Sequence, residues 1–146
     1  MANRVKTTLI AGGLAGLVSG IPSTVYLLVT GGDLLASVNA LVAMVAASEL
    51  PVLNRLAIAA AVHFTVSFFW ASVLVAIIPR RAPVIGALVA SAIITFLDLE
   101  VIAPRYFAEA AALAFIPQLA DHLAWGATVG AVLRMRRPSF VDTSQS

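Results

Sequence analysis

The chain has 146 residues, of which 61% are hydrophobic and 11% are charged, and its mean hydropathy is +1.01. A water-soluble fold of this size cannot hide so much apolar surface, whereas the outside of a helix bundle in lipid can be as apolar as its inside. The absence of cysteine excludes disulfides, thiolate nucleophiles and cysteine-bound metal clusters. Nucleic acid is excluded as a partner because the basic residues sit at the ends of apolar runs and form no patch with aromatics.

The first apolar run extends from about residue 7 to residue 30 and follows Arg4 and Lys6. At 1.5 Å per residue it is long enough to cross roughly 30 Å of hydrocarbon. A signal peptide also begins with positive charge, but its apolar region is shorter than this run, which continues through Pro22. We therefore predict an uncleaved transmembrane helix.

Residues 33–50 follow, with Leu34, Val38, Leu41 and Val45 at helical spacing and small, weakly polar residues on the other side. This stretch is short for a membrane span. We predict an interfacial or re-entrant helix on the outer face of the membrane.

Three further apolar runs are long enough to span, at residues 55–79, 83–103 and 108–133. Residues 106–116 have a second interpretation, a short surface helix before Pro117. The last stretch, residues 138–146, is polar. The sequence thus predicts one transmembrane helical-bundle domain over residues 1–137 and a polar cytoplasmic tail over residues 138–146.

The placement of the basic residues predicts the orientation, because Lys and Arg collect in short cytoplasmic segments. If residues 33–50 also crossed the membrane, this bias would collapse. We therefore predict an all-α integral membrane protein with four transmembrane helices and both termini inside. Seven basic residues then face the cytoplasm and two face outward: Arg4, Lys6, Arg80, Arg81, Arg134, Arg136 and Arg137 against Arg55 and Arg105.

Small residues four positions apart mark expected contact faces between helices in lipid. Gly12, Gly16 and Gly20 form two overlapping GxxxG units on the first helix, and Gly126 and Gly130 form another on the last. Comparable stripes of small or polar residues occur on the two helices between them: Ala60, His63, Ser67 and Ala71, and then Ala87, Ser91, Thr95 and Asp98.

Ionisable residues within the runs each require a partner, because an unpaired charge in hydrocarbon is costly. Glu100 is interpreted as an interfacial carboxylate that reaches the surface or pairs with Arg105. His63 and Asp98 lie on these stripes, and the last helix carries one broad stripe of its own: Gln118, Asp121, His122, Trp125 and Gly126. These residues are expected to meet across the bundle. They define a candidate polar cluster in the outer half of the membrane: His63, Asp98, Asp121, His122 and Gln118.

Three interpretations of this cluster stay open. Its members are hydrogen-bond partners between helices, or they handle protons or a cation in an outward-opening cavity, or His63 and His122 hold a metal or a haem. The histidine spacing matches no metal motif, so no cofactor is predicted and the metal question stays undecided. No catalytic residue is assigned, because Ser19 between Gly16 and Gly20 has the wrong spacing for a nucleophile elbow.

Two stretches, residues 19–24 (SGIPST) and 117–126 (PQLADHLAWG), resemble small uncharacterised multi-pass membrane proteins of bacteria. The resemblance implies a membrane location and no activity. We expect a multi-pass protein of the cell inner membrane, a non-enzymatic accessory, assembly or lipid-contacting component. Its expected partners are the lipid bilayer and other membrane-protein subunits or further copies of the chain. The alternatives are a small transporter, channel or proton-responsive protein, or a metal- or haem-binding membrane protein.

Overall fold

The computed structural model describes residues 2–46, 50–79 and 81–136. In these ranges the chain is helical and contains no β-strand, which confirms the predicted all-α class. The predicted tail 138–146, and Arg80 and Arg137 of the charge count, lie outside the described residues. The helices are α1 (Ala2–Ser19), α2 (Ile21–Thr30), α3 (Ala36–Ala43), α4 (Val52–Ile77), α5 (Pro83–Phe96), the π-helix η1 (Leu97–Ile102), α6 (Ala103–Tyr106), α7 (Ala108–Ala111) and α8 (Phe115–Met135).

Three stretches of the structure are long and apolar enough to cross a membrane: Asn3–Thr30, Val52–Ile77 and Pro83–Tyr106. They coincide to within a few residues with the first three apolar runs predicted from the sequence. Much of their surface is apolar and exposed, as at Val29, Leu53 and Ile85, which are 81%, 78% and 67% exposed. Large apolar side chains in such numbers on the outside of a bundle are typical of lipid-facing helices.

The first span is broken between α1 and α2 at Gly20. Pro22 is the cause, because proline has no backbone N–H and its ring excludes the carbonyl four residues earlier. Helix α2 then restarts with Gly20 as its N-cap and ends at Gly31, which adopts the left-handed conformation that favours glycine.

The chain between the first two spans forms only one helix in its described part, α3, of 8 residues. At 1.5 Å per residue α3 is about 12 Å long, far short of a bilayer. The structure thus has a short helix where the sequence predicts one that does not cross.

The fourth predicted run, residues 108–133, is two helices rather than one. Helix α7 ends at Ala111, and α8 begins only at Phe115 and continues to Met135. Pro117 lies in the first turn of α8, where its missing N–H costs no helical hydrogen bond. The predicted start of the fourth helix was therefore wrong by about two turns, and the alternative of a short helix before Pro117 is the better description.

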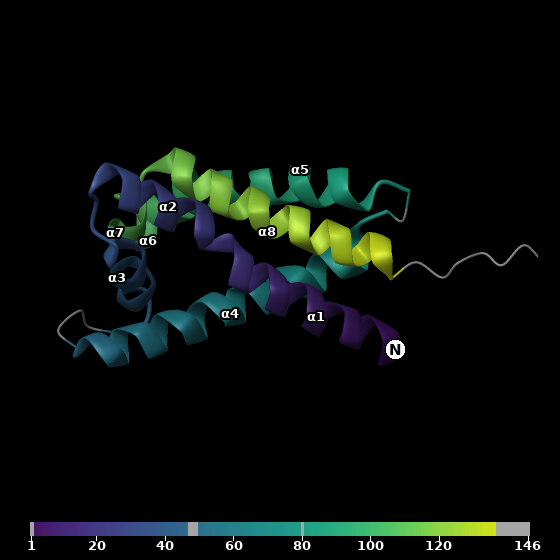
Figure 1. The fold of residues 1–146 in the computed structure, drawn as a ribbon, viewed down its shortest axis with the longest axis horizontal. Helices are drawn as coiled ribbons and strands as arrows, with labels where there is room; N and C mark the ends of the chain where they lie inside the picture. The colour runs from purple at the N-terminus through teal and green to yellow at the C-terminus, as the bar shows by residue number, and fades with distance from the viewer. Residues whose placement is uncertain (1, 47–49, 80, 137–146) are drawn as a thin grey trace, which may run out of the picture.

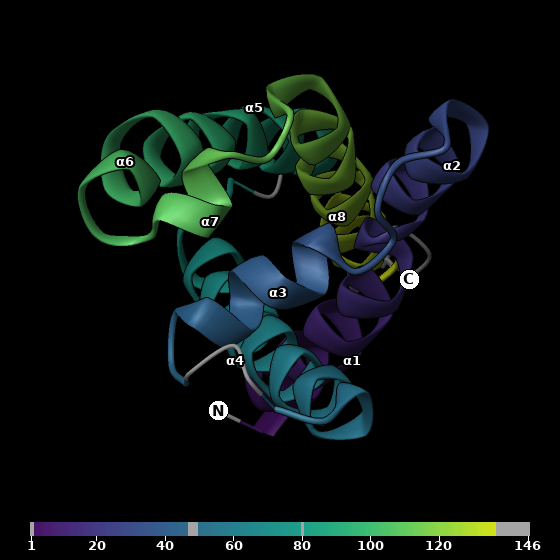
Figure 2. The same cartoon turned by 90° about the vertical axis from the view of Figure 1, so that its left-hand side faces the viewer.

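The long helices are arranged in a row in the order α4, α1, α8, α5, each packed mainly against its neighbours in the row. Viewed from one end, α8 lies between α5 and α1 (Figure 2). Helix α2 also packs on α8, although α1 and α2 come first in the chain and α8 last. The last long helix is thus the central one.

Small side chains allow this close packing. The core consists largely of alanine and valine with one tryptophan, Trp125. A Cβ built on Gly130 would lie 2.6 Å from the Cα of Val84, and one on Gly126 would lie 2.7 Å from the Ala87 carbonyl oxygen. On the other side of the row, a Cβ on Gly12 would meet the Phe68 ring. Glycine is therefore required where α8 meets α5 and where α1 meets α4.

The short helices α3, α6 and α7 gather at one end of the molecule, opposite the N-terminus (Figure 1). Ala40, Ala103 and Ala110 are buried together there. The Arg55 guanidinium at the start of α4 donates a 2.7 Å hydrogen bond to the Asn39 side-chain oxygen of α3. We call this assembly of α3, α6 and α7 the cap.

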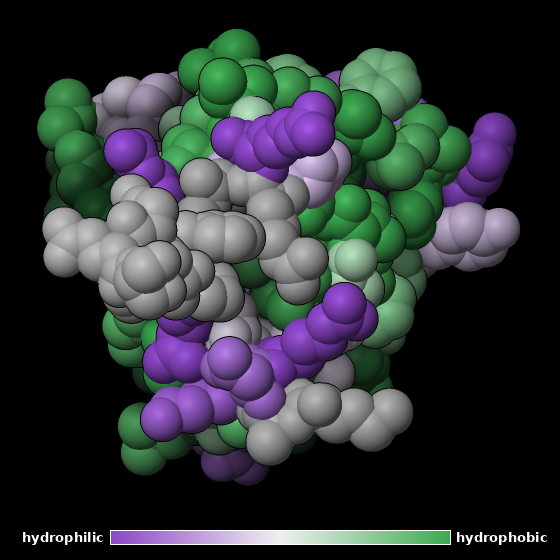
Figure 3. All heavy atoms as spheres, turned by 90° about the vertical axis from the view of Figure 1, so that its right-hand side faces the viewer, coloured by the Kyte–Doolittle hydropathy of each residue, from purple (hydrophilic) through white to green (hydrophobic). Residues whose placement is uncertain are grey.

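The other end of the molecule is basic. The N-terminus, the turn between α4 and α5 and the end of α8 lie together at this end (Figure 1), and several hydrophilic side chains stand out among hydrophobic ones on the face seen there (Figure 3). In the described part of the chain, every acidic residue lies in α8 near its start or in the segments toward the cap. The basic residues of this end are Arg4, Lys6, Arg81, Arg134 and Arg136.

Replacing Gly130 by alanine should weaken the contact between α5 and α8, because the added methyl group meets backbone atoms that cannot move aside. We expect a loss of about 1–3 kcal/mol in the free energy of unfolding, measured by detergent titration. Gly20→Ala is the matched control, since a Cβ at Gly20 has nothing within 4 Å. Equal stability of the two variants would contradict this account of the helix contact.

Candidate functional site

Helix α4 is held to α1 by side chains that bind α1 carbonyl groups. His63 Nε2 lies 2.9 Å from the Gly16 carbonyl oxygen, and Ser67 Oγ donates a 2.8 Å hydrogen bond to the Gly12 carbonyl oxygen. A carbonyl only accepts, so His63 Nε2 must carry the hydrogen. Ser19 Oγ lies 3.2 Å from the same nitrogen. Gly12 and Gly16 allow α4 to approach α1 closely, and their carbonyl groups then accept the hydrogen bonds from α4.

The same contact extends to the central helix. Trp125 Nε1 on α8 donates a 2.8 Å hydrogen bond to Ser67 Oγ, which in turn donates to Gly12. Both side chains are buried. One serine hydroxyl therefore joins three helices, and the tryptophan N–H, which is costly to bury alone, has a partner.

The break between α1 and α2 is closed by a carboxylate from α8. Asp121 is 9% exposed, and its Oδ1 accepts a 2.8 Å hydrogen bond from the backbone N–H of Ser23. Ser23 is the third residue of α2, one of the first N–H groups that lack a partner within their own helix. Asp121 thus acts as an N-terminal cap supplied from a different helix, placed where the helix dipole favours negative charge.

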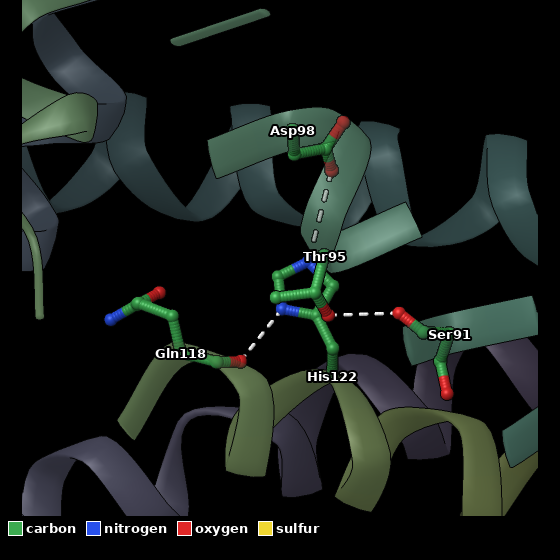
Figure 4. Close-up of polar contacts among 5 residues, drawn as sticks. All are labelled: Ser91, Thr95, Asp98, Gln118 and His122. Carbon is green, nitrogen blue, oxygen red and sulfur yellow. Dashed lines mark hydrogen bonds and ion pairs between the residues drawn. The ribbon is translucent and has the colours of Figure 1, made fainter. Parts of the chain in front are cut away.

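The second histidine belongs to a different contact, between α8 and η1 (Figure 4). His122 Nδ1 lies 2.8 Å from the Gln118 carbonyl oxygen, so Nδ1 is the donor. Its other nitrogen, Nε2, lies 3.8 Å from Asp98 Oδ2. In a neutral ring with Nδ1 as donor, Nε2 would turn its lone pair toward the Asp98 carboxylate. His122 and Asp98 therefore attract each other only when one of these two groups binds an additional proton.

The structure brings some of the five candidate residues together across helices, but no hydrogen bond or ion pair among the described residues joins all five. His63 and Asp121 bind opposite sides of the helix break, through Gly16 and Ser23, whereas His122 and Asp98 form the separate pair at η1. Asp121 and His122 are consecutive on α8 and so point about 100° apart, which sends them to different neighbours.

The Gln118 side chain borders a small pocket between α2, α3 and α8, together with Ser23 and Ser37. Its volume is about 40 Å³, room for about one water molecule. Ser37 Oγ is buried and has no hydrogen-bond partner among the described residues. A bound water would give this hydroxyl a partner.

The interpretation of His63 and His122 as metal ligands requires further ligands close to them. No group of three or more His, Cys, Asp or Glu side chains close enough for a metal ion occurs in residues 2–46, 50–79 and 81–136. Glu100, expected at the interface, is exposed on η1 and makes no ion pair with Arg105 within the described stretch 81–136.

Two partners in these contacts were not assigned from the sequence, the backbone N–H of Ser23 and the Trp125–Ser67 bond. A signal for the first was present: Pro22 predicts a helix start, and a helix start leaves N–H groups unpaired. The second had none beyond Ser67 and Trp125 each lying on a polar stripe. Spacing within two helices does not determine which of their faces meet.

Comparison of the chain with protein-family models, curated protein sequences and solved structures found no match.

Substitutions of Asp121 should separate its capping role from its charge. Asp121→Asn keeps an oxygen that accepts from Ser23, whereas Asp121→Ala leaves that N–H without its partner. We expect the alanine variant to lose about 1–3 kcal/mol of stability and to speed hydrogen exchange in α2, with little change in the asparagine variant. Exchange unchanged by the alanine substitution would show that the cap does not hold α2.

Proposed function

We propose that the chain is a four-span protein of a bacterial inner membrane, with both termini in the cytoplasm, that acts without catalysis as an accessory or assembly component through contacts with lipid and other membrane proteins. Three spans follow from length and hydropathy. The fourth is α8, whose 21 residues match roughly 30 Å of hydrocarbon at 1.5 Å per residue.

Helix α8 is not among the three most apolar stretches, and its central place in the row of helices explains why. Asp121, Trp125, Gly126 and Gly130 are all buried against other helices. A central helix shows little of its surface to lipid, so its polar groups need protein partners rather than apolar neighbours. This supports α8 as a span despite its composition.

The orientation is supported by the segregation of charge. The basic end carries the N-terminus, the α4–α5 turn and the end of α8 (Figure 1), so an even number of spans brings them all to one side. Because Lys and Arg favour short cytoplasmic segments, we place this end inside and the cap outside.

The observation that carries the non-catalytic role is the use made of the buried polar groups. His63, Ser67 and Asp121 are all engaged with backbone groups of α1 or α2. The pocket beside Ser23 and Gln118 holds about 40 Å³, too small for a substrate. These side chains hold helices together, as expected of a protein that works through its surface.

Single cysteines test the four spans, since the chain has no cysteine of its own. Asp33→Cys and Glu109→Cys should react with a membrane-impermeant maleimide on intact spheroplasts. Arg81→Cys and Arg136→Cys should react only after the membrane is opened. Reaction of Glu109→Cys and Arg136→Cys from the same side would remove α8 from the spans.

Photo-crosslinking tests the accessory role. A photoreactive residue is placed in native membranes at Val29, Leu53 or Ile85, which are exposed on three different helices. We expect at least one position to yield an adduct with another protein chain, and the positions to differ, because a specific contact uses one face. Recovery of the monomer alone from all three, with no lipid retained on purification, would contradict the proposal.

A proton-responsive or transporting role is the second candidate, favoured by two observations. The first span is discontinuous, and helix ends at membrane depth often line ion or substrate sites. The His122–Asp98 pair is also partly exposed, at 28% and 33% of the two side chains. A proton on this pair could exchange with water outside the membrane.

Proteoliposomes loaded with a pH-sensitive dye test this candidate. If the pair carries protons, the wild-type protein acidifies the vesicles faster than protein-free vesicles do, and combined Asp98→Asn and His122→Gln substitutions abolish the difference. Glu100→Gln, on the same π-helix, is the control and should leave the rate unchanged. A wild-type rate equal to that of empty vesicles would reject the transport role.

A further inference from the structure

A groove of about 230 Å³ lies between α1 and α4 at the basic end. The two helices approach closely at Gly12, where a Cβ would lie 3.2 Å from the Cα of Phe68, and separate toward the N-terminus (Figure 1). The groove occupies the space that this divergence opens. Helix α1 lines it with Arg4, Val5, Thr8 and Leu9, and α4 lines it with Val75 and Ala76 among others.

The groove changes character along its length. Arg4 lies at its outer end, on the first turn of α1, whereas Val5, Leu9 and Val75 make its walls apolar. Long basic side chains at helix ends reach the headgroup level of a bilayer. The groove therefore runs from the headgroups into the hydrocarbon layer, the path that a phospholipid follows.

Charge around the outer end favours an anionic lipid. Lys6 is exposed two residues after Arg4 and adds to the positive charge of this end without lining the groove. The described part of this end contains no carboxylate. A guanidinium binds phosphate oxygens through paired hydrogen bonds. With no acidic side chain nearby to receive an amine, a headgroup with a net negative charge fits better than a zwitterionic one.

The volume limits the occupant. Pockets that enclose a drug-sized molecule measure about 300–1,000 Å³, so a groove of about 230 Å³ holds part of one acyl chain and leaves the rest of the lipid in the bilayer. A complete lipid-binding chamber is not required, because the surrounding bilayer supplies the other walls.

We propose that this groove binds one anionic phospholipid of the cytoplasmic leaflet, with its phosphate at Arg4 and one acyl chain between Leu9 and Val75. The assignment rests on the proposed insertion of the chain with its basic end inside. It makes the α1–α4 surface a specific lipid site, distinct from the polar contacts at the helix break.

Native mass spectrometry of the full chain in mild detergent tests the site, with phosphatidylglycerol and phosphatidylethanolamine offered in equal amounts. We expect one phosphatidylglycerol to be retained in preference. Arg4→Gln should reduce that preference about fivefold, the effect of removing one basic residue at an anionic surface. Ala76→Trp, which fills the groove and keeps the charge, should abolish retention of the lipid.

Arg81→Gln is the control, since it removes a charge from the same end without lining the groove. Thermal unfolding confirms that each variant folds. Equal retention of the two lipids, an equal effect of the Arg4 and Arg81 substitutions, or a dimer that Ala76→Trp disrupts would each overturn the proposal. Correct cysteine labelling with no lipid preference overturns only the groove, whereas reversed labelling overturns the proposed orientation whatever lipid is bound.

Discussion

The structure depends on the close approach of α4 to the glycine face of α1. Lipid gives helices little hydrophobic reason to associate, so contact and hydrogen bonding must hold them together. Gly12 and Gly16 serve both needs: without side chains they admit Phe64 and Phe68, and their carbonyls accept hydrogen bonds from α4. A larger residue at either position would remove the contact and the bonds together.

The buried polar residues of this protein also serve to join helices. The buried side chains of Ser67, Trp125 and Asp121 each hydrogen-bond a backbone group or a side chain of another helix, whereas Ser37 Oγ has no partner among the described residues. Trp125 and Asp121 both belong to α8, which lies in the middle of the row. Asp121 shows the principle most clearly. A carboxylate that would be costly in lipid instead completes the end of a helix that proline has interrupted.

Sequence reasoning located the helices better than their partners. Length and hydropathy predicted the three most apolar spans because those properties belong to single segments. The start of α8 was misplaced because Ala108 to Ala114 is as apolar as a span, and only the turn before Phe115 separates it. The stripe containing His63 and Ser67 was recognised, but its partner was not, since pairing depends on how helices rotate against each other. For the same reason the sequence placed both histidines in one cluster without identifying their partners, which are the Gly16 carbonyl for His63 and Asp98 for His122.

The row of helices also has a consequence for biosynthesis. Helix α5 packs chiefly against α8 among the long helices, and α8 is translated after it. In the proposed four-span insertion, α1 and α4 can pair before α8 is synthesised, whereas α5 lacks its main packing partner until α8 follows. A polypeptide terminated before α8 would leave the face of α5 that packs on α8 uncovered.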